Sequence, residues 1–105
     1  MNLKDTADCL AELGNETRLE IFRFLVKCGN KKVLVGDIKK EINIPNSTLS
    51  HHLSRLAKVG LILQEKEGRQ IICQPQFNQL QGMIDFLLEE CCEGESCLTK
   101  PKTCC

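Results

Sequence analysis

Apolar residues recur along most of the chain at the spacing of an amphipathic helix, interrupted by short polar or glycine-containing turns. The pattern predicts helices over residues 5–13, 15–27, 35–42, 46–59 and 78–91, with Asn15 as the N-cap of the second. Residues 61–67 and 70–74 are expected to form two short strands joined by a turn at Gly68-Arg69, and Lys31-Lys32 begins a connector. The predicted fold class is mainly helical with one small β-hairpin.

The fourth predicted helix has two chemically different sides. Leu49, Leu53 and Leu56 are spaced four and three residues apart and form one apolar seam, which we expect to face the core. Pro45 is expected at its first helical position and Gly60 just beyond its end. With the seam inward, the opposite side carries short hydrogen-bonding groups and long cations: Ser47, Thr48, His51, Ser54, Arg55 and Lys58.

Such side chains suit base edges and phosphates in a DNA major groove. The alternative is an ordinary solvated helix face, which usually carries more Glu and Lys and fewer Ser and His. The order of three helices, a turn, a further helix, a hairpin and a last helix is that of a winged helix-turn-helix. We therefore predict that this face contacts double-stranded operator DNA, and that Arg69 on the hairpin reaches phosphates or the minor groove. His52 is expected on the flank of the same helix.

Charge is separated along the chain. Lys plus Arg and Asp plus Glu both number 14, so the net charge is zero and a bulk polycation is excluded. Residues 39–69 nevertheless hold six cations against three acids, whereas residues 78–105 hold two against five. The basic part coincides with the predicted DNA-binding segment. With no Trp or Tyr and four Phe, a single-strand binder with aromatic stacking platforms is unexpected.

The ends of the predicted domain carry more apolar surface than one small chain can bury. The broad apolar face of the last predicted helix, with Met83, Ile84, Leu87 and Leu88, is therefore a candidate dimer face. No nucleotide-binding glycine loop, cleft constellation or acid/base pair indicates an enzyme.

Cysteine usage divides the chain into a domain over 1–91 and a cysteine-rich tail over 92–105. No apolar run is long enough to span a membrane and the N-terminus lacks a signal-peptide core, so the expected location is the cytoplasm. Disulfides are disfavoured there. Cys9, Cys28 and Cys73 have apolar neighbours and are expected to be small buried hydrophobes. The other five of the eight cysteines fall in the last 15 residues, where a ligand or redox role is expected.

Three stretches, "LGNETRLEIFRFL", "VGDIKKEINIPNSTLSHHLSRLAKVGLI" and "QEKEGRQIIC", resemble the ArsR/SmtB family over roughly residues 3–90. The resemblance implies a winged-helix repressor that forms a homodimer through its first and last helices and leaves its operator when an inducer binds. Six residues are then expected to be buried only when a second copy is present: Leu3, Leu10, Met83, Ile84, Leu87 and Leu88. Three sensor sites of the family are not matched. Residues 34–38 lack the two thiols of one arsenic and cadmium site, the last helix lacks the histidines of zinc, nickel and cobalt sensors, and Arg23 occupies the position of one persulfide-sensing cysteine.

Cys91, Cys92 and Cys97 resemble the site of a subgroup of arsenic-responsive repressors with three thiols at the end of the last helix. Trivalent arsenic and antimony are soft and take three thiolates, so one of them is the expected inducer, and no other cofactor is expected. The alternative is a thiol-redox, persulfide or cadmium response on the same fold. Nearby glutamates and the helix C-terminus disfavour a reactive thiolate. Cys104 and Cys105 are expected as an accessory ligand pair, a competing site or a pair without a role.

Overall fold

The computed structural model describes residues 1–91, and it confirms a mainly helical winged helix-turn-helix. Among these residues, no helix is long and apolar enough to cross a membrane. The elements in chain order are α1 (Leu3–Leu13), α2 (Glu16–Cys28), β1 (Val33–Leu34), α3 (Val35–Ile42), α4 (Asn46–Lys58), β2 (Ile62–Glu67), β3 (Gln70–Pro75) and α5 (Phe77–Leu88).

The sheet has three antiparallel strands in the order β1-β3-β2, one more than the predicted hairpin. The extra strand β1 lies where the sequence indicated only a connector. Val33 is paired with Cys73, and Leu34 with Ile72. A strand of two residues is too short to show any periodicity, so it is defined by its partner β3.

The predicted start of α4 at residue 46 is confirmed, but two predictions at helix ends are wrong: the position of Pro45 by one residue and the end of the last helix by about three. Pro45 is the N-cap of α4, in extended backbone, and Asn46 is the first helical residue. The last helix ends at Leu88 instead of about Cys91. At that end the Glu89 N–H donates to the Phe86 carbonyl, a three-residue spacing that tightens the final turn. Cys91 therefore lies beyond α5.

The residues predicted to begin α2 and to end α4 do so in the structure. The Asn15 side chain accepts a hydrogen bond from the Arg18 N–H at 3.0 Å and so begins α2 as predicted. Gly60 ends α4 with a φ of 80°, a conformation that costs glycine little. Its N–H donates to the Ala57 carbonyl at 3.0 Å. The chain then enters β2.

The core lies between α2, α4 and the sheet. Leu49, Leu53 and Leu56 are fully buried, which confirms the predicted seam of α4. They share the core with Ile21 and Leu25 of α2. Cys9 and Cys73 are fully buried and Cys28 is partly buried against the core, so these cysteines pack much as predicted.

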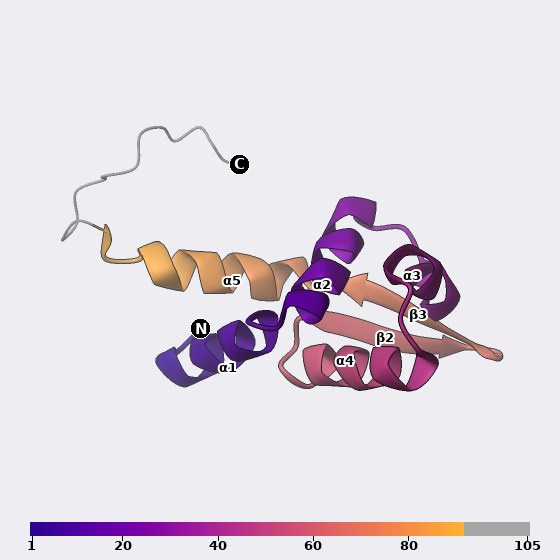
Figure 1. Ribbon diagram of the computed structural model, residues 1–105. Coiled ribbons are helices and arrows are strands. Elements are labelled where there is room, and N and C mark those ends of the chain that lie inside the picture. The colour runs from indigo at the N-terminus through magenta and orange to yellow at the C-terminus, as the bar shows by residue number, and fades with distance from the viewer. Residues whose placement is uncertain (92–105) are drawn as a thin grey trace.

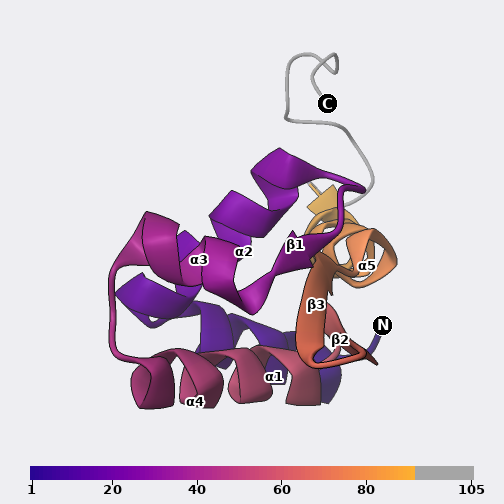
Figure 2. The same ribbon diagram turned by 90° about the vertical axis from the view of Figure 1, so that its right-hand side faces the viewer.

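Figures 1 and 2 show the helices packed against the sheet, with the hairpin β2–β3 projecting at one end of the molecule in Figure 1 and α5 extending at the other. Helices α1 and α5 pack together. They leave Leu3, Leu10, Ile84, Leu87 and Leu88 exposed. Met83 departs from the prediction, because it is only 4% exposed in the single chain and belongs to the core.

We expect Leu53→Ala to lower the free energy of unfolding by about 2–5 kcal/mol, because it removes a fully buried side chain and leaves a cavity. Urea unfolding followed by circular dichroism measures the change. Ser54→Ala is the matched control on the exposed side of the same helix and should shift stability by less than about 0.5 kcal/mol. Equal losses in both variants would mean that the seam does not hold α4 in place.

Candidate nucleic-acid interface

Helix α4 presents a continuous polar side to solvent. It packs against α1, α2 and β2 through its leucines. All six residues predicted for DNA contact are exposed on it: Ser47, Thr48, His51, Ser54, Arg55 and Lys58. The structure thus places them together on one surface of a firmly packed helix, as a groove-reading helix requires. Their contact with DNA stays a prediction.

Arg55 is held by an acid that the sequence did not point to. The Glu12 carboxylate on α1 accepts hydrogen bonds from Arg55 Nε at 2.8 Å and from Arg55 Nη2 at 3.0 Å, in the paired geometry of an arginine–carboxylate fork. These bonds lower the pKa of Glu12 below its ordinary value and raise that of Arg55. Because the two residues are 43 positions apart, no local pattern indicates the pair.

Behind this fork, Arg18 of α2 joins Glu12 to His52. Arg18 Nε donates to the Glu12 backbone carbonyl at 2.7 Å and lies 3.3 Å from its carboxylate. Arg18 Nη1 lies 3.2 Å from His52 Nδ1. Since a guanidinium has no acceptor, His52 Nδ1 must accept this hydrogen bond and is unprotonated.

His52 is buried, which corrects its predicted place on the flank of the helix. Desolvation, followed by the nearby positive charge of Arg18, lowers the pKa of its imidazole below the ordinary value. His51, its neighbour in sequence, points out with the polar side of α4. The two histidines therefore have different roles, and only His51 is available to a ligand.

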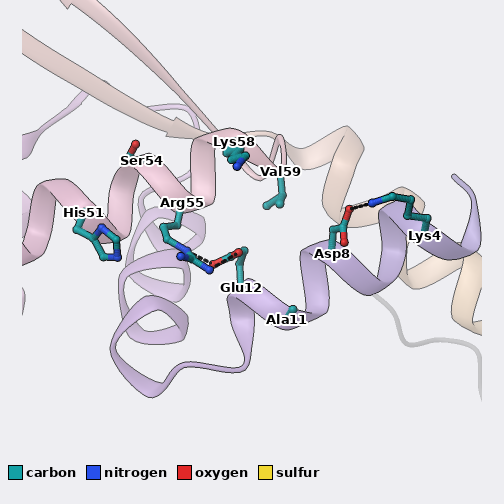
Figure 3. A pocket seen from close by; sticks show the side chains of 9 residues that line it. All are labelled: Lys4, Asp8, Ala11, Glu12, His51, Ser54, Arg55, Lys58 and Val59. Carbon is teal, nitrogen blue, oxygen red and sulfur yellow. Dashed lines mark hydrogen bonds and ion pairs between the residues drawn. The ribbon is translucent and has the colours of Figure 1, made fainter.

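A cleft of about 470 Å³ lies between α1 and α4 beside the Glu12–Arg55 pair. Figure 3 shows the pair bridging the two helices, with Lys4 and Asp8 joined further along α1. His51, Ser54 and Lys58 of the predicted DNA face also line it. The polar side of α4 thus continues into a hollow with α1, which the sequence did not indicate.

The hairpin ends in a tight turn. Gly68 has a φ of 62°, and Arg69 follows it exposed at the tip, as predicted. Lys32 Nζ lies 3.0 Å from Glu67 Oε2 and ties β2 to the segment before β1. This ion pair neutralises the negative charge of Glu67, an acidic residue of the hairpin close in sequence to Arg69.

The predicted inducer site lies largely beyond the described residues. Cys91 is partly buried and follows α5, while Cys92, Cys97, Cys104 and Cys105 fall outside the part of the chain that the structure describes. Within residues 1–91, no group of three or more His, Cys, Asp or Glu could hold a metal ion.

Solved structures share this fold. The ArsR family transcriptional regulator RHA00566 superposes with a TM-score of 0.75 over 91% of this chain and 98% of its own, at 18% identity. The homodimeric winged helix-turn-helix DNA-binding domain Mb0332 from Mycobacterium bovis, described as a possible ArsR-family regulator, gives a TM-score of 0.67 over 90% of this chain and 87% of its own, at 21% identity.

Two curated relatives are transcription regulators. The transcriptional activator HlyU of Vibrio cholerae is 27% identical over 81% of this chain and 76% of its own length. The putative arsenical resistance operon repressor ArsR of Halobacterium salinarum is 35% identical over 57% of this chain and 46% of its own. The chain thus spans about half the length of that repressor.

A helix-turn-helix domain family matches residues 13–65, half of the chain. The chain belongs to this helix-turn-helix domain family, and its winged helix-turn-helix fold is the one found in ArsR-family regulators. The chain is a DNA-binding transcription regulator, and the prediction that it is no enzyme agrees with the two curated relatives above, which are transcription regulators. The matched segment runs from the end of α1 into β2 and includes the whole of α4.

The lowered pKa of His52 predicts that the regulator loses stability in mild acid. Above the unfolded-state pKa of about 6.5 both states are neutral at this position. Below it, the unfolded chain binds a proton that the folded chain resists, so the free energy of unfolding falls as pH falls. Thermal melts between about pH 7.5 and about pH 5.5 measure this loss.

His52→Gln should remove most of this acid-dependent loss, whereas His51→Gln on the exposed side should retain it. An undiminished loss in His52→Gln would assign the acid sensitivity to other groups.

Proposed function

We propose that the regulator is a homodimeric repressor that binds operator DNA through the exposed side of α4. We further propose that trivalent arsenic or antimony, bound by Cys91, Cys92 and Cys97, releases it. The single observation that carries the DNA face is the polar side of α4, exposed along its whole length and backed by three buried leucines. The inducer is argued from the spacing of the thiols.

The DNA face combines two kinds of contact. Thr48, His51 and Ser54 offer short donors and acceptors to base edges, whereas Arg55 and Lys58 supply positive charge to phosphates or guanine. The exposed Arg69 at the hairpin tip is a further cation for the flanking backbone. A rigid helix that carries both kinds of group is suited to the major groove.

Dimerisation is supported by apolar surface that the single chain leaves uncovered. Leu87 is 59% exposed and Leu3 is 74% exposed, on two helices that pack together. A symmetric dimer through α1 and α5 would cover both and place two α4 helices for an inverted repeat. Half-sites about 34 Å apart, or a multiple of that distance, are expected. The structural neighbour Mb0332 is described as homodimeric, which supports dimerisation on this fold.

The inducer assignment is supported by thiol chemistry. Three cysteines fall within seven residues, close enough for one small soft ion. Trivalent arsenic is satisfied by three thiolates, whereas structural zinc would need a fourth ligand from Cys104 or Cys105. A metalloid also displaces thiol protons as it binds, so acidic neighbours do not prevent binding. A relative named as an arsenical resistance repressor supports the same assignment.

Coupling follows from where the thiols lie in the chain. Cys91 comes three residues after the end of α5, so an ion bound there acts on the helix proposed to form the dimer. Helix α1 contacts both α5 and α4, which gives a short route from the thiols to the DNA face. The inducer must then bind the DNA-free form more tightly, by the same factor by which it weakens operator binding.

Arsenite should release the wild-type regulator from its operator. A 100-fold loss of affinity would correspond to about 2.7 kcal/mol of coupling. Ser substitution at Cys91, Cys92 or Cys97 should abolish release and spare DNA binding, because none of the three lies on α4. Fluorescence anisotropy with a duplex selected from a random library by the wild-type protein, titrated with arsenite at fixed salt, measures both quantities.

The controls are Cys9→Ser, Cys28→Ser and Cys73→Ser, which should keep the response wherever the variant folds. The pair Cys104→Ser and Cys105→Ser is expected to keep it as well. If arsenite still releases from the operator a variant that lacks Cys91, Cys92 and Cys97, the inducer site lies elsewhere. A wild-type protein that ignores arsenite and responds to polysulfide would favour the redox alternative.

Leu87→Asp should give monomers and abolish operator binding, because it places a charge in the proposed dimer contact. Analytical ultracentrifugation at micromolar concentration gives the mass. Leu19→Asp is the matched control, since Leu19 on α2 is also partly exposed but lines the hollow between α2 and α3, and that variant should stay dimeric. A monomeric wild type under the same conditions would contradict the proposal.

A further inference from the structure

Glu12 occupies an unusual place for an acid beside a DNA-binding surface. It lies near the end of α1, faces α4, and its side chain is only 14% exposed. Two arginines approach its carboxylate, Arg55 at 2.8 Å and Arg18 at 3.3 Å. A free acid at this position would repel phosphates, but here one negative charge lies between two positive ones, and the cluster stays net positive.

The two arginines differ in their exposure and in the N–H donors that remain available to a ligand. Arg18 is 12% exposed and already donates to the Glu12 carbonyl and to His52. Arg55 is 47% exposed, and the fork uses one hydrogen on Nε and one on Nη2. A guanidinium has five N–H donors, so three remain on Arg55, including both on Nη1. Arg55 can therefore keep Glu12 and still bind an acceptor on DNA.

The Glu12–Arg55 fork immobilises Arg55 before DNA binds, and this lowers the conformational entropy that is lost on binding. A free arginine side chain loses conformational freedom when it is immobilised on a ligand. In this structure the fork has already fixed Nε and Nη2 against α1, in a planar geometry that defines where the remaining donors lie. The fork thus reduces the entropy that Arg55 would lose on contacting DNA.

We propose that Glu12 is a positioning residue for DNA recognition: it fixes the Arg55 guanidinium so that its remaining donors meet a phosphate or guanine acceptor of the operator. This inference rests on the proposed DNA face. It also makes α1 part of the DNA-binding apparatus, because a displacement of α1 relative to α4 would change the orientation of Arg55. Removing the acid should then weaken operator binding, although added positive charge alone would strengthen it.

The test compares two substitutions that make the same change in charge. Glu12→Gln loses the carboxylate that holds Arg55. Asp8→Asn, one turn earlier on α1, loses a carboxylate that lines the same cleft and is paired with Lys4 instead of an arginine of α4 or α2. With the selected duplex, Glu12→Gln should bind about five- to tenfold more weakly than wild type, and Asp8→Asn as tightly or slightly more tightly. A duplex of shuffled sequence distinguishes a guanine contact from a phosphate contact. If Arg55 contacts guanine, Glu12→Gln weakens binding to the selected duplex alone. If Arg55 contacts a phosphate, it weakens binding to both duplexes.

A structural effect through Arg18 is separated by a double-mutant cycle. In an Arg55→Ala background, Glu12→Gln should cause no further loss, because the side chain that it positions is gone. A loss that persists there would show that Glu12 acts through Arg18 and the fold, and would overturn the proposal. Glu12→Gln binding as tightly as Asp8→Asn would overturn it too. If Arg55→Ala itself binds like wild type, Arg55 lies outside the interface and the proposed DNA face fails at that residue.

Discussion

Burial of one edge of α4 is the constraint on which the rest of the structure depends. Leu49, Leu53 and Leu56 are each removed completely from solvent, at roughly 1.5–3 kcal/mol per side chain. Because a helix is rigid about its axis, fixing these three fixes the direction of every other residue on it. The polar residues therefore project outward in a single array. The DNA face is a consequence of the core.

Charged and polar side chains form a second set of interactions that joins the helices. Glu12, Arg18, His52 and Arg55 form one connected set that joins α1, α2 and α4. Its buried members satisfy one another, and its exposed member keeps donors to spare. Helix α1 consequently has two roles, with apolar residues left exposed beside α5 and a carboxylate directed to α4. The same helix can connect the proposed dimer contact with the proposed DNA face.

The sequence predicts features whose signal is local and periodic. The leucine seam, its opposite polar side, the Asn15 cap and the Gly60 stop all follow from spacing within one helix. The prediction for Met83 is wrong because the apolar side of α5 is broad, and periodicity does not tell which part of that side packs into the core of its own chain. His52 and the Glu12–Arg55 fork could not be predicted, since their partners are distant in the sequence and are brought together only by packing. The proposed metalloid site is argued from thiol spacing and chemistry and from the resemblance to arsenic-responsive repressors, because most of its residues lie outside the described part of the chain.

The most direct test of the DNA face is a residue-by-residue map of the duplex on the folded protein. Amide chemical shifts of the ¹⁵N-labelled regulator should be recorded as its selected duplex is added. The account predicts that the largest changes fall on Thr48, His51 and Ser54 of α4 and on Arg69 at the hairpin tip. Changes concentrated instead in the hollow between α2 and α3, around Leu19 and Arg23, with α4 unaffected, would contradict it.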